Sequence, residues 1–314
     1  MTEPRIGVVG ATGAVGQVTL ELLAERGFGQ VRAFASSRSA GTAVPYGGSE
    51  LEVEEATPAA LGAGELDLCF FSVGTAQSAE LVPVAVSGGA ICVDKSSAFR
   101  LTEGIPLVVP EVNGDRATAH DGIVANPNCS TIQLVCALSP LHEAAGLTSV
   151  RVATYQSASG AGAERMEALR TQLPADGDIV MDWDFEGDES DEESKLRAET
   201  RKILELPDLP ISATCARVPV LVGHSQAVWI ETERPLSPDE ARDVLDAAPG
   251  VTVAERPTPL QAVGGDQVLV GRIREDRAGE GLALWVVCDN LRKGAALNAI
   301  QIAELLLERR AVAA

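Results

Sequence analysis

Apolar and polar positions alternate in two different ways along the chain. In the first 128 residues, short apolar runs alternate with stretches that have helical spacing. The apolar runs lie at 5–9, 31–36, 66–74, 90–94 and 123–127, and the stretches with helical spacing lie at 17–27 and 76–89. Continuous apolar strands that alternate with helices are typical of a parallel sheet covered on both faces. The pattern therefore predicts an α/β domain over residues 1–128.

After residue 128 the pattern changes. The stretch STIQLVCALSPLHEAAG reads as a helix that ends at Gly146. Longer strands with polar alternation follow at 149–157, 211–220, 225–235, 267–276 and 281–290. Such alternation predicts an antiparallel or mixed sheet, so we expect an α+β domain over 129–289. The last stretch, 290–314, contains a helix with one apolar stripe, which predicts that it returns to the first domain.

Composition and charge narrow the possible functions. The 314 residues include 25 Lys and Arg against 45 Asp and Glu, a net charge of −20. A field of that sign repels phosphate backbones, so we expect neither nucleic acid nor an anionic membrane as a partner. MTEPRIGVVG has no basic stretch followed by an apolar one, so we do not expect a secretory leader, and no apolar stretch reaches the roughly 20 residues of a membrane span. The six cysteines form no CxxC pair, so we expect no metal and a reducing, cytoplasmic location.

One segment is unusually acidic. Residues 176–193 (DGDIVMDWDFEGDESDEE) hold ten acidic residues and no basic one. We interpret this segment as a solvated, partly disordered loop, since charge runs repel themselves and bury little apolar surface. A metal site is the less favoured interpretation, because the acidic residues show no regular ligand spacing.

A glycine-rich turn follows the first apolar run. GATGAVG places Gly10, Gly13 and Gly16 between a strand and a helix, where glycines let a pyrophosphate approach the helix N-terminus. The second run ends at Ser36, and Ser37 and Arg38 follow, without the acidic residue that usually holds the ribose 2′-hydroxyl of NAD. Hydroxyls and a guanidinium suit a 2′-phosphate, so we predict NADP rather than NAD. An ordinary surface loop is the alternative.

One cysteine is a candidate nucleophile. Cys129, in NPNCSTIQ, lies where the predicted helix begins, and helix N-termini favour the thiolate. The other cysteines lie mostly inside apolar runs, where a thiol is usually inert. Of the three histidines, His224 lies at a polar break between two apolar strands and is the candidate acid/base by elimination. The alternative is a histidine that only satisfies a strand end.

Ten motifs, in this order, carry a resemblance to one enzyme family. They are GATGAVG, ASSRSAG, SSAFR, VVPEVN, NPNCSTIQ, YQSASGAG, ETRKIL, TCARVPV, GHSQ and DNLRKGAALNAIQIAE. Together they resemble aspartate-semialdehyde dehydrogenases from about residue 6 to 305. The resemblance implies a Rossmann-type NADP domain, an α+β catalytic and dimerisation domain, and homodimers or tetramers, of which we expect the homodimer. It implies NADPH-dependent reductive dephosphorylation of L-aspartyl 4-phosphate to L-aspartate 4-semialdehyde through a Cys129 thioester, in lysine, threonine and methionine biosynthesis.

The resemblance also implies roles for individual residues. Cys129 would be the nucleophile, His224 the acid/base, and Gln156 the group that orients the acyl chain. Arg217 would bind the substrate carboxylate, Glu199 would face its amine, and Arg100, Asn128 and Lys202 would hold its phosphate. The implied cofactor-binding residues are Gly10, Thr12, Gly13, Ala14, Val15, Gly16, Ser36, Ser37, Arg38, Ser72, Ser159, Gly160 and Asn290. Without the family, Glu199 and Lys202 would read as a surface ion pair at i,i+3 on a helix.

The match weakens at three places. Lys95 stands where the family commonly has Asn, and Thr75 where many members have Gly. The acidic segment 176–193 replaces a longer subdomain that often helps to form the dimer.

Four other functions are alternatives. They are N-acetyl-glutamyl-phosphate reductase, an acyl-CoA reductase, a nucleotide-binding paralogue without turnover, and a thiol hydrolase. The motif NPNCST argues against the first of them.

Overall fold

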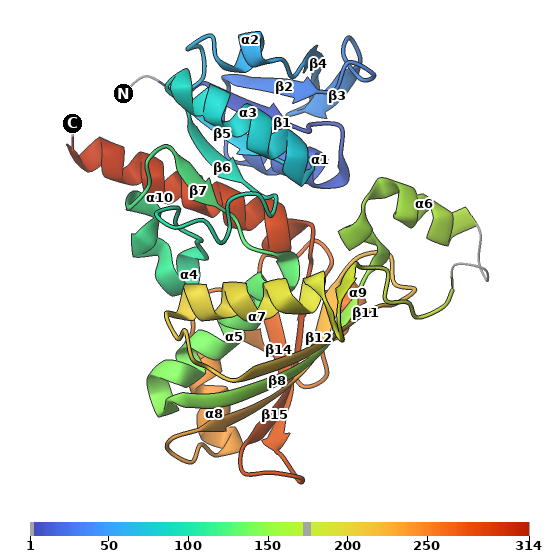
Figure 1. The fold of residues 1–314 in the computed structure, drawn as a ribbon, viewed down its shortest axis with the longest axis vertical. Coiled ribbons are helices and arrows are strands. Elements are labelled where there is room, and N and C mark those ends of the chain that lie inside the picture. The colour runs from blue at the N-terminus through green and yellow to red at the C-terminus, as the bar shows by residue number, and fades with distance from the viewer. Residues whose placement is uncertain (1–2, 172–176, 314) are drawn as a thin grey trace. The chain divides into compact units, whose positions relative to one another are not determined.

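The computed structural model describes residues 3–171 and 177–313, with side chains up to residue 309. The chain forms two compact units, Met1–Pro127 with Ala295–Ala314, and Asn128–Gly294. Figure 1 labels most of their helices and strands. No helix within the described residues is both long and apolar enough to cross a membrane.

The first unit contains a seven-stranded sheet in the order β3-β4-β2-β1-β5-β6-β7. Its strands are β1 (Ile6–Val9), β2 (Val31–Ala35), β3 (Ala43–Tyr46), β4 (Ser49–Glu55), β5 (Leu68–Phe71), β6 (Ile91–Asp94) and β7 (Ile123–Ala125). All neighbours run parallel except β3 and β4, which form an antiparallel pair at the edge. Five of these strands confirm the predicted apolar runs. The pattern did not predict β3 and β4, because an edge hairpin as polar as SELEVEE lacks an apolar run.

Helices cover both faces of this sheet. They are α1 (Ala14–Glu25), α2 (Pro58–Leu61), α3 (Thr75–Ser87), α4 (Pro110–Asn113) and α10 (Leu297–Ala313). One apolar core lies between the sheet and α1 with α10, and another between the sheet and α2 with α3. β1 pairs with both β2 and β5, so the chain changes face at β1. The carboxyl end of β1 is thus the switch point of a doubly wound sheet, as the prediction of a Rossmann-type domain requires.

The second unit contains a six-stranded mixed sheet in the order β11-β8-β12-β15-β14-β13. Its strands are β8 (Leu147–Gln156), β11 (Ile211–Arg217), β12 (His224–Thr232), β13 (Val251–Val253), β14 (Val268–Glu275) and β15 (Leu282–Cys288). The pairs β11–β8 and β13–β14 are parallel and the others antiparallel. The predicted mixed sheet is confirmed, and only the short β13 was not predicted.

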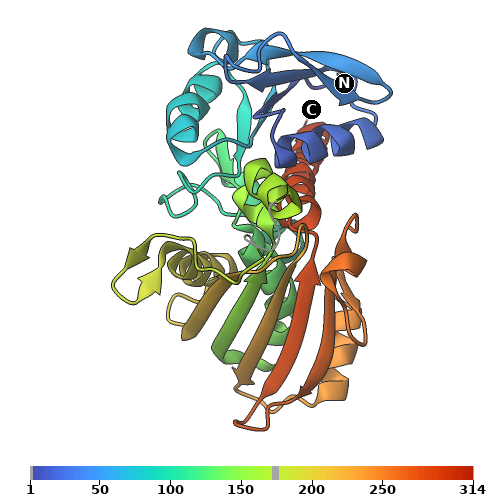
Figure 2. The same ribbon diagram turned by 90° about the vertical axis from the view of Figure 1, so that its right-hand side faces the viewer.

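Helices pack on one face of this second sheet. They are α5 (Cys129–Ala145), α7 (Asp191–Leu204) and α8 (Pro238–Asp246), while α6 (Ala163–Thr171) and α9 (Pro259–Ala262) lie in connections. α5 contacts β8, β12, β14 and β15, and it also packs against α7 and α8 (Figure 2). Side chains at alternate strand positions therefore point either into this helical layer or to the opposite face.

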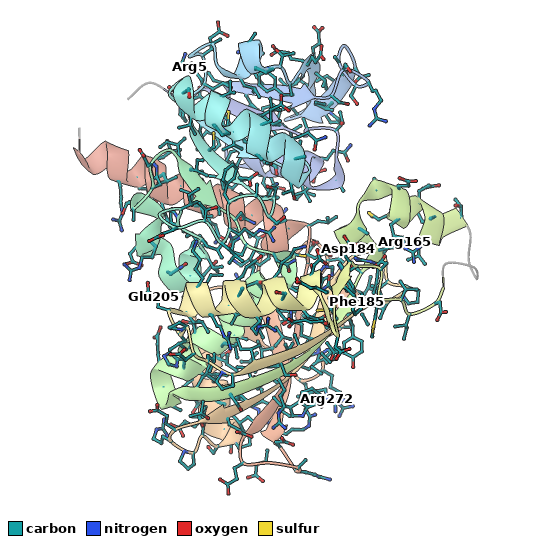
Figure 3. All side chains as sticks on the ribbon, viewed as in Figure 1. Arg5, Arg165, Asp184, Phe185, Glu205 and Arg272 are labelled. Carbon is teal, nitrogen blue, oxygen red and sulfur yellow. The ribbon has the colours of Figure 1, made fainter. Side chains whose placement is uncertain are left out.

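The interpretation of 176–193 as a solvated loop is wrong for its second half. Residue 176 lies outside the described residues. β9 (Phe185–Glu186) and β10 (Glu189–Ser190) form a hairpin, and α7 follows directly (Figure 3 labels Phe185). Ser190 caps α7 in a capping box with Glu193, so acidic side chains occupy the helix N-terminus, where negative charge is stabilised. Glu192 and Glu193 are buried.

Candidate active site

Cys129 is the first residue of α5. Asn128 is the N-cap, and its Oδ1 accepts a hydrogen bond from Ser130 N at 2.7 Å. Cys129 is half-buried, whereas the other five cysteines are buried. A Cβ at Gly294 would lie 3.2 Å from the Cys129 Cβ, so a bare backbone leaves room beside the thiol. The partial positive charge of the helix N-terminus favours a thiolate at this position.

His224 lies directly beside this thiol. Its Nε2 is 3.2 Å from the Cys129 Sγ, and its ring is fully buried. The backbone N–H of Ser157 donates to Nδ1 at 3.0 Å. A ring nitrogen that accepts from an amide carries no proton, so the neutral imidazole is protonated on Nε2, facing the sulfur. Burial lowers the pKa of His224 to about 3, and the charge of Arg217 contributes in the same direction.

The other two histidines have structural partners. His120 Nδ1 accepts from Gly122 N at 2.9 Å, and His142 Nδ1 accepts from Leu147 N at 3.0 Å. Both bonds are local in sequence and stabilise turns. This leaves His224 as the histidine in contact with a cysteine.

A hydroxyl and amide network holds His224 from behind. Ser157 Oγ lies 3.0 Å from His224 Nδ1 and donates to Asn290 Oδ1 at 3.0 Å. Asn290 Oδ1 also accepts from Gly223 N, and its Nδ2 donates to Ser159 Oγ. A Cβ at Gly160 would lie 3.0 Å from the His224 Cε1, which explains a glycine there. Ser159, Gly160 and Asn290, which were predicted to bind the cofactor, thus lie around His224.

Helix α7 contributes acidic side chains to the residue that precedes the nucleophile. The N–H of Asn128 donates to Glu199 Oε2 at 2.7 Å, and its Nδ2 donates to Glu192 Oε1 at 2.9 Å. Gln156 Nε2 donates to the same Glu192 oxygen at 3.0 Å. Glu199 is 1% exposed, so it is not half of a surface ion pair. Lys202 lies on the same helix, and burial lowers its pKa while Glu199 opposes that shift.

Arg217 ends β11 and is 5% exposed. Its Nη1 donates to Ser157 O at 3.1 Å, and its Nε donates to Asp182 at 2.8 Å. The Trp183 ring lies against its guanidinium, 4.7 Å from Cζ to centroid. Val180 exchanges two backbone hydrogen bonds with Arg217, so this part of the acidic segment follows the end of β11. A carboxylate of the chain therefore occupies one side of the arginine that was predicted to bind a substrate carboxylate.

The glycine turn of the first unit suits a dinucleotide. Gly10 has φ 86°, and a Cβ there would lie 2.4 Å from Ser72 O. A Cβ at Gly16 would lie 2.1 Å from Gly10 O. Gly13 is the N-cap of α1 and makes no side-chain cap, so the first N–H groups of this twelve-residue helix remain available to an anion. This turn, with Thr12, Ala14 and Val15 at its helix start, fits a pyrophosphate.

Four of the remaining predicted residues of the first unit lie at the carboxyl ends of strands, and Arg100 lies in the connection after β6 (Ile91–Asp94). Ser36, Ser37 and Arg38 form an exposed turn after β2, and Ser72 follows β5. Arg100 is buried, and it donates to Asn126 O at 3.1 Å and to Lys95 O at 2.6 Å.

Lys95 and Thr75, the two single residues that depart from the family pattern, each lie within hydrogen-bond distance of another side chain. Lys95 Nζ donates to Thr19 Oγ1 at 3.2 Å, and burial lowers its pKa to about 7, opposed by Asp94. Thr75 Oγ1 lies 2.9 Å from Ser97 Oγ.

Among the described residues, no group of three or more His, Cys, Asp or Glu side chains is placed to hold a metal ion.

The sequence reasoning missed Glu192, Asp182 and Trp183, because it assigned all three to a solvated loop. A signal was present for Glu192. Ser190 and Glu193 form a capping-box pair at the start of a helical pattern, and Glu192 is seven positions before Glu199, on the same helical face.

Comparisons with known proteins place the chain in a class. Residues 5–120 match the family model "Semialdehyde dehydrogenase, NAD binding domain". Residues 138–184 and 180–293 match "Semialdehyde dehydrogenase, dimerisation domain". The fold, with a nucleotide-binding unit and a unit that carries a cysteine–histidine pair, is thus that of a semialdehyde dehydrogenase.

Individual relatives narrow the class. Aspartate-semialdehyde dehydrogenases from Corynebacterium glutamicum and Aquifex aeolicus are each 44% identical to this chain. The match with the Corynebacterium enzyme covers 96% of this chain and 99% of the relative. The match with the Aquifex enzyme covers 97% of this chain and 98% of the relative. The crystal structure of aspartate-semialdehyde dehydrogenase II from Vibrio cholerae is similar to this chain, with a TM-score of 0.92 and 37% sequence identity. The match covers 98% of this chain and 99% of that chain. The crystal structure of the same enzyme in complex with ASA gives the same values. The Candida albicans enzyme with NADP has a TM-score of 0.79 at 28% identity over 97% and 98%. The chain belongs to the aspartate-semialdehyde dehydrogenase family.

Proposed function

We propose that this protein catalyses the reversible, phosphate-dependent interconversion of L-aspartyl 4-phosphate and L-aspartate 4-semialdehyde with NADP. The observation that carries the proposal is the contact between Cys129 Sγ and His224 Nε2, 3.2 Å apart at the start of a helix. A nucleophile and its hydrogen-bonding partner within reach of each other are what covalent catalysis requires. The names of the relatives supply the substrate.

In the reductive direction, the Cys129 thiolate attacks the acyl carbon of the substrate and phosphate leaves, which gives a thioester. When bound, the nicotinamide cofactor would supply the hydride that reduces this thioester. His224 presents Nε2–H to the sulfur and to the oxyanion that develops next to it. When the aldehyde forms, the C–S bond breaks and the thiolate returns, stabilised again by the helix N-terminus and Nε2–H.

The resemblance to the family implies the substrate-binding roles, and the charges of the side chains support them. Arg217 would bind the α-carboxylate through its guanidinium, and Glu199 would accept from the α-amine. Lys202, Asn128 and Arg100 would hold the phosphate. Gln156 would orient the acyl group.

The proposed cofactor is NADP rather than NAD. Its support is the exposed turn Ser36–Ser37–Arg38 after β2, which offers two hydroxyls and a guanidinium and no carboxylate of its own to a 2′-phosphate. A ratio of KM values close to one for the two cofactors would contradict this preference. Free thiols at all six cysteines fit a reducing compartment, so we infer a cytoplasmic location.

We propose that the protein is a homodimer. The face of the second sheet opposite α5 and α7 carries Tyr155, Trp229 and Trp285, with the rings of Tyr155 and Trp285 5.5 Å apart. Apolar and aromatic side chains on an open face are typical of a subunit interface. Sedimentation of the wild-type chain and of Trp229→Glu should show a dimer and a monomer, respectively.

The deciding experiment follows NADPH formation at 340 nm from L-aspartate semialdehyde and NADP, with and without phosphate. We expect turnover that requires phosphate and is lost in Cys129→Ala but retained in Cys136→Ala, a buried cysteine of the same helix. Turnover in Cys129→Ala would refute the thioester route. Turnover without phosphate would refute phosphate as the acceptor of the acyl group, since water would then release it from Cys129. Activity confined to an N-acetylated glutamate semialdehyde or to an acyl-CoA would indicate one of the rival enzymes.

A further inference from the structure

Glu192 is a buried carboxylate that joins two residues of the proposed site. It is 6% exposed and lies in the first turn of α7. One of its oxygens, Oε1, accepts hydrogen bonds from Asn128 Nδ2 at 2.9 Å and from Gln156 Nε2 at 3.0 Å. Asn128 precedes the nucleophile and Gln156 ends β8, so one oxygen connects two elements at the site.

A carboxylate in this position determines which way both amides face. Because Oε1 accepts from both side chains, each amide turns its NH₂ group toward Glu192. The Oδ1 of Asn128 is then directed to Ser130 N, where it caps α5 at 2.7 Å. The carbonyl oxygen of Gln156 is correspondingly directed away from Glu192.

Helix α7 therefore holds the residue before Cys129 at two points. Glu199 lies seven positions after Glu192, on the same face of the helix, and accepts from the backbone N–H of Asn128 at 2.7 Å. A fixed backbone and a fixed amide leave Asn128 little freedom to rotate. The adjoining Cys129 is then held in one direction relative to His224.

We propose that Glu192 is a positioning residue that orients the amides of Asn128 and Gln156 around Cys129. The proposal rests on the proposed function, because these two amides are its substrate-orienting groups. Glu192 itself does not touch the reacting atoms. Its effect should appear in kcat, because a misplacement of about 1 Å can cost roughly a hundredfold in rate.

The adjacent Glu193 is a matched control. It is equally buried, at 6%, but its carboxylate accepts from Ser190 N in the capping box and from Cys215 N. These bonds stabilise the helix start and its packing on β11. The two glutamates thus separate an orienting role from a stabilising one.

The test compares Glu192→Ala, Glu192→Gln and Glu193→Gln in the full-length protein, with kcat, KM and Tm measured for each. We expect Glu192→Ala to lower kcat about tenfold to a hundredfold. Glu192→Gln should recover most of this loss, because its carbonyl oxygen can accept from both amides. Glu193→Gln should lower Tm and keep kcat within about twofold at temperatures well below Tm.

A kcat of Glu192→Ala equal to wild type would overturn the proposal, as would a Glu192→Gln variant that is as slow as Glu192→Ala. Alkylation of Cys129 by iodoacetamide, read by mass spectrometry, should remain stoichiometric in Glu192→Ala, which shows that the nucleophile is intact. If the wild-type protein shows no turnover, the proposed function fails. The side-chain NH₂ resonances of Asn128 and Gln156 then test the orientation directly: both should shift in Glu192→Ala, and unchanged resonances would overturn it.

Discussion

Replacing His224 by Gln should flatten the pH dependence of stability of the second unit. His224 is fully buried and neutral, and burial lowers its pKa to about 3 from an ordinary value of 6.5. Between these two values the unfolded chain binds a proton at His224 and the folded chain does not. Stability from this residue is therefore complete above about pH 6.5 and is lost as the pH falls toward 3.

The expected change in the free energy of unfolding follows from the number of pH units between the two measurements. Each pH unit in this window changes the free energy of unfolding by about 1.4 kcal/mol. Between pH 7.5 and pH 4.5 the wild-type protein should lose about 3 kcal/mol through His224 alone. In His224→Gln this part of the loss should disappear, while losses from carboxylates remain.

The assay is urea unfolding at the two pH values, followed by tryptophan fluorescence. Trp183, Trp229 and Trp285 all belong to the second unit, so the signal reports that unit together with the proposed dimer interface, and both proteins are compared at the same concentration. The pH-independent cost of replacing a buried side chain cancels when each protein is compared with itself. An equal pH dependence in the two proteins would refute a neutral, buried His224.

Three further predictions concern neighbours of this site. Gly160→Ala should lower kcat about tenfold to a hundredfold, because its Cβ would lie 3.0 Å from the His224 Cε1 and 3.3 Å from the Arg217 Nη1. Asp182→Asn should lower the KM for L-aspartate semialdehyde at nearly constant kcat, because the substrate carboxylate no longer competes with Asp182 for Arg217. Ser190→Ala should reduce the free energy of unfolding by about 1 kcal/mol, measured by urea unfolding, because α7 loses its N-cap.

Each of these predictions has a contrary outcome. A Gly160→Ala enzyme with wild-type kcat would show that the imidazole has room to move. A higher KM in Asp182→Asn would mean that Asp182 supports the arginine instead of competing for it. An unchanged stability of Ser190→Ala would mean that other contacts alone hold the start of α7.

The sequence predicted most of the architecture because the periodicity was strong. Uninterrupted apolar runs identified β1, β2, β5, β6 and β7, each of which is covered on both faces. The edge strands β3 and β4 escaped because a partly solvated hairpin needs no apolar run. The hairpin and the helix start within residues 185–193 were not predicted, because the run of acidic residues indicated a solvated loop more strongly than the capping box indicated a helix.

Residues of the site could be named from the sequence, but the contacts between them could not be predicted. Cys129 and His224 could be singled out from local patterns, a helix start and a polar break between strands. Residues 128 and 156 are far along the chain from each other and from helix α7, which carries Glu192 and Glu199. No periodicity indicates that one carboxylate would accept from the amides of both Asn128 and Gln156. Such a bond depends on the packing of α7 against the beginning of α5.

The sequence by itself determined most of the segments that become strands, where the glycine turn lies, and which thiol stands at a helix N-terminus, because each of these is a local property of the chain. Only the tertiary structure decided that His224 Nε2 faces the Cys129 sulfur, that an acidic helix holds Asn128, and that Asp182 lies on Arg217. These contacts join residues 35 to 95 positions apart. Their geometry is set by how the sheet and helices of the second unit bury their apolar faces together, which local patterning does not specify.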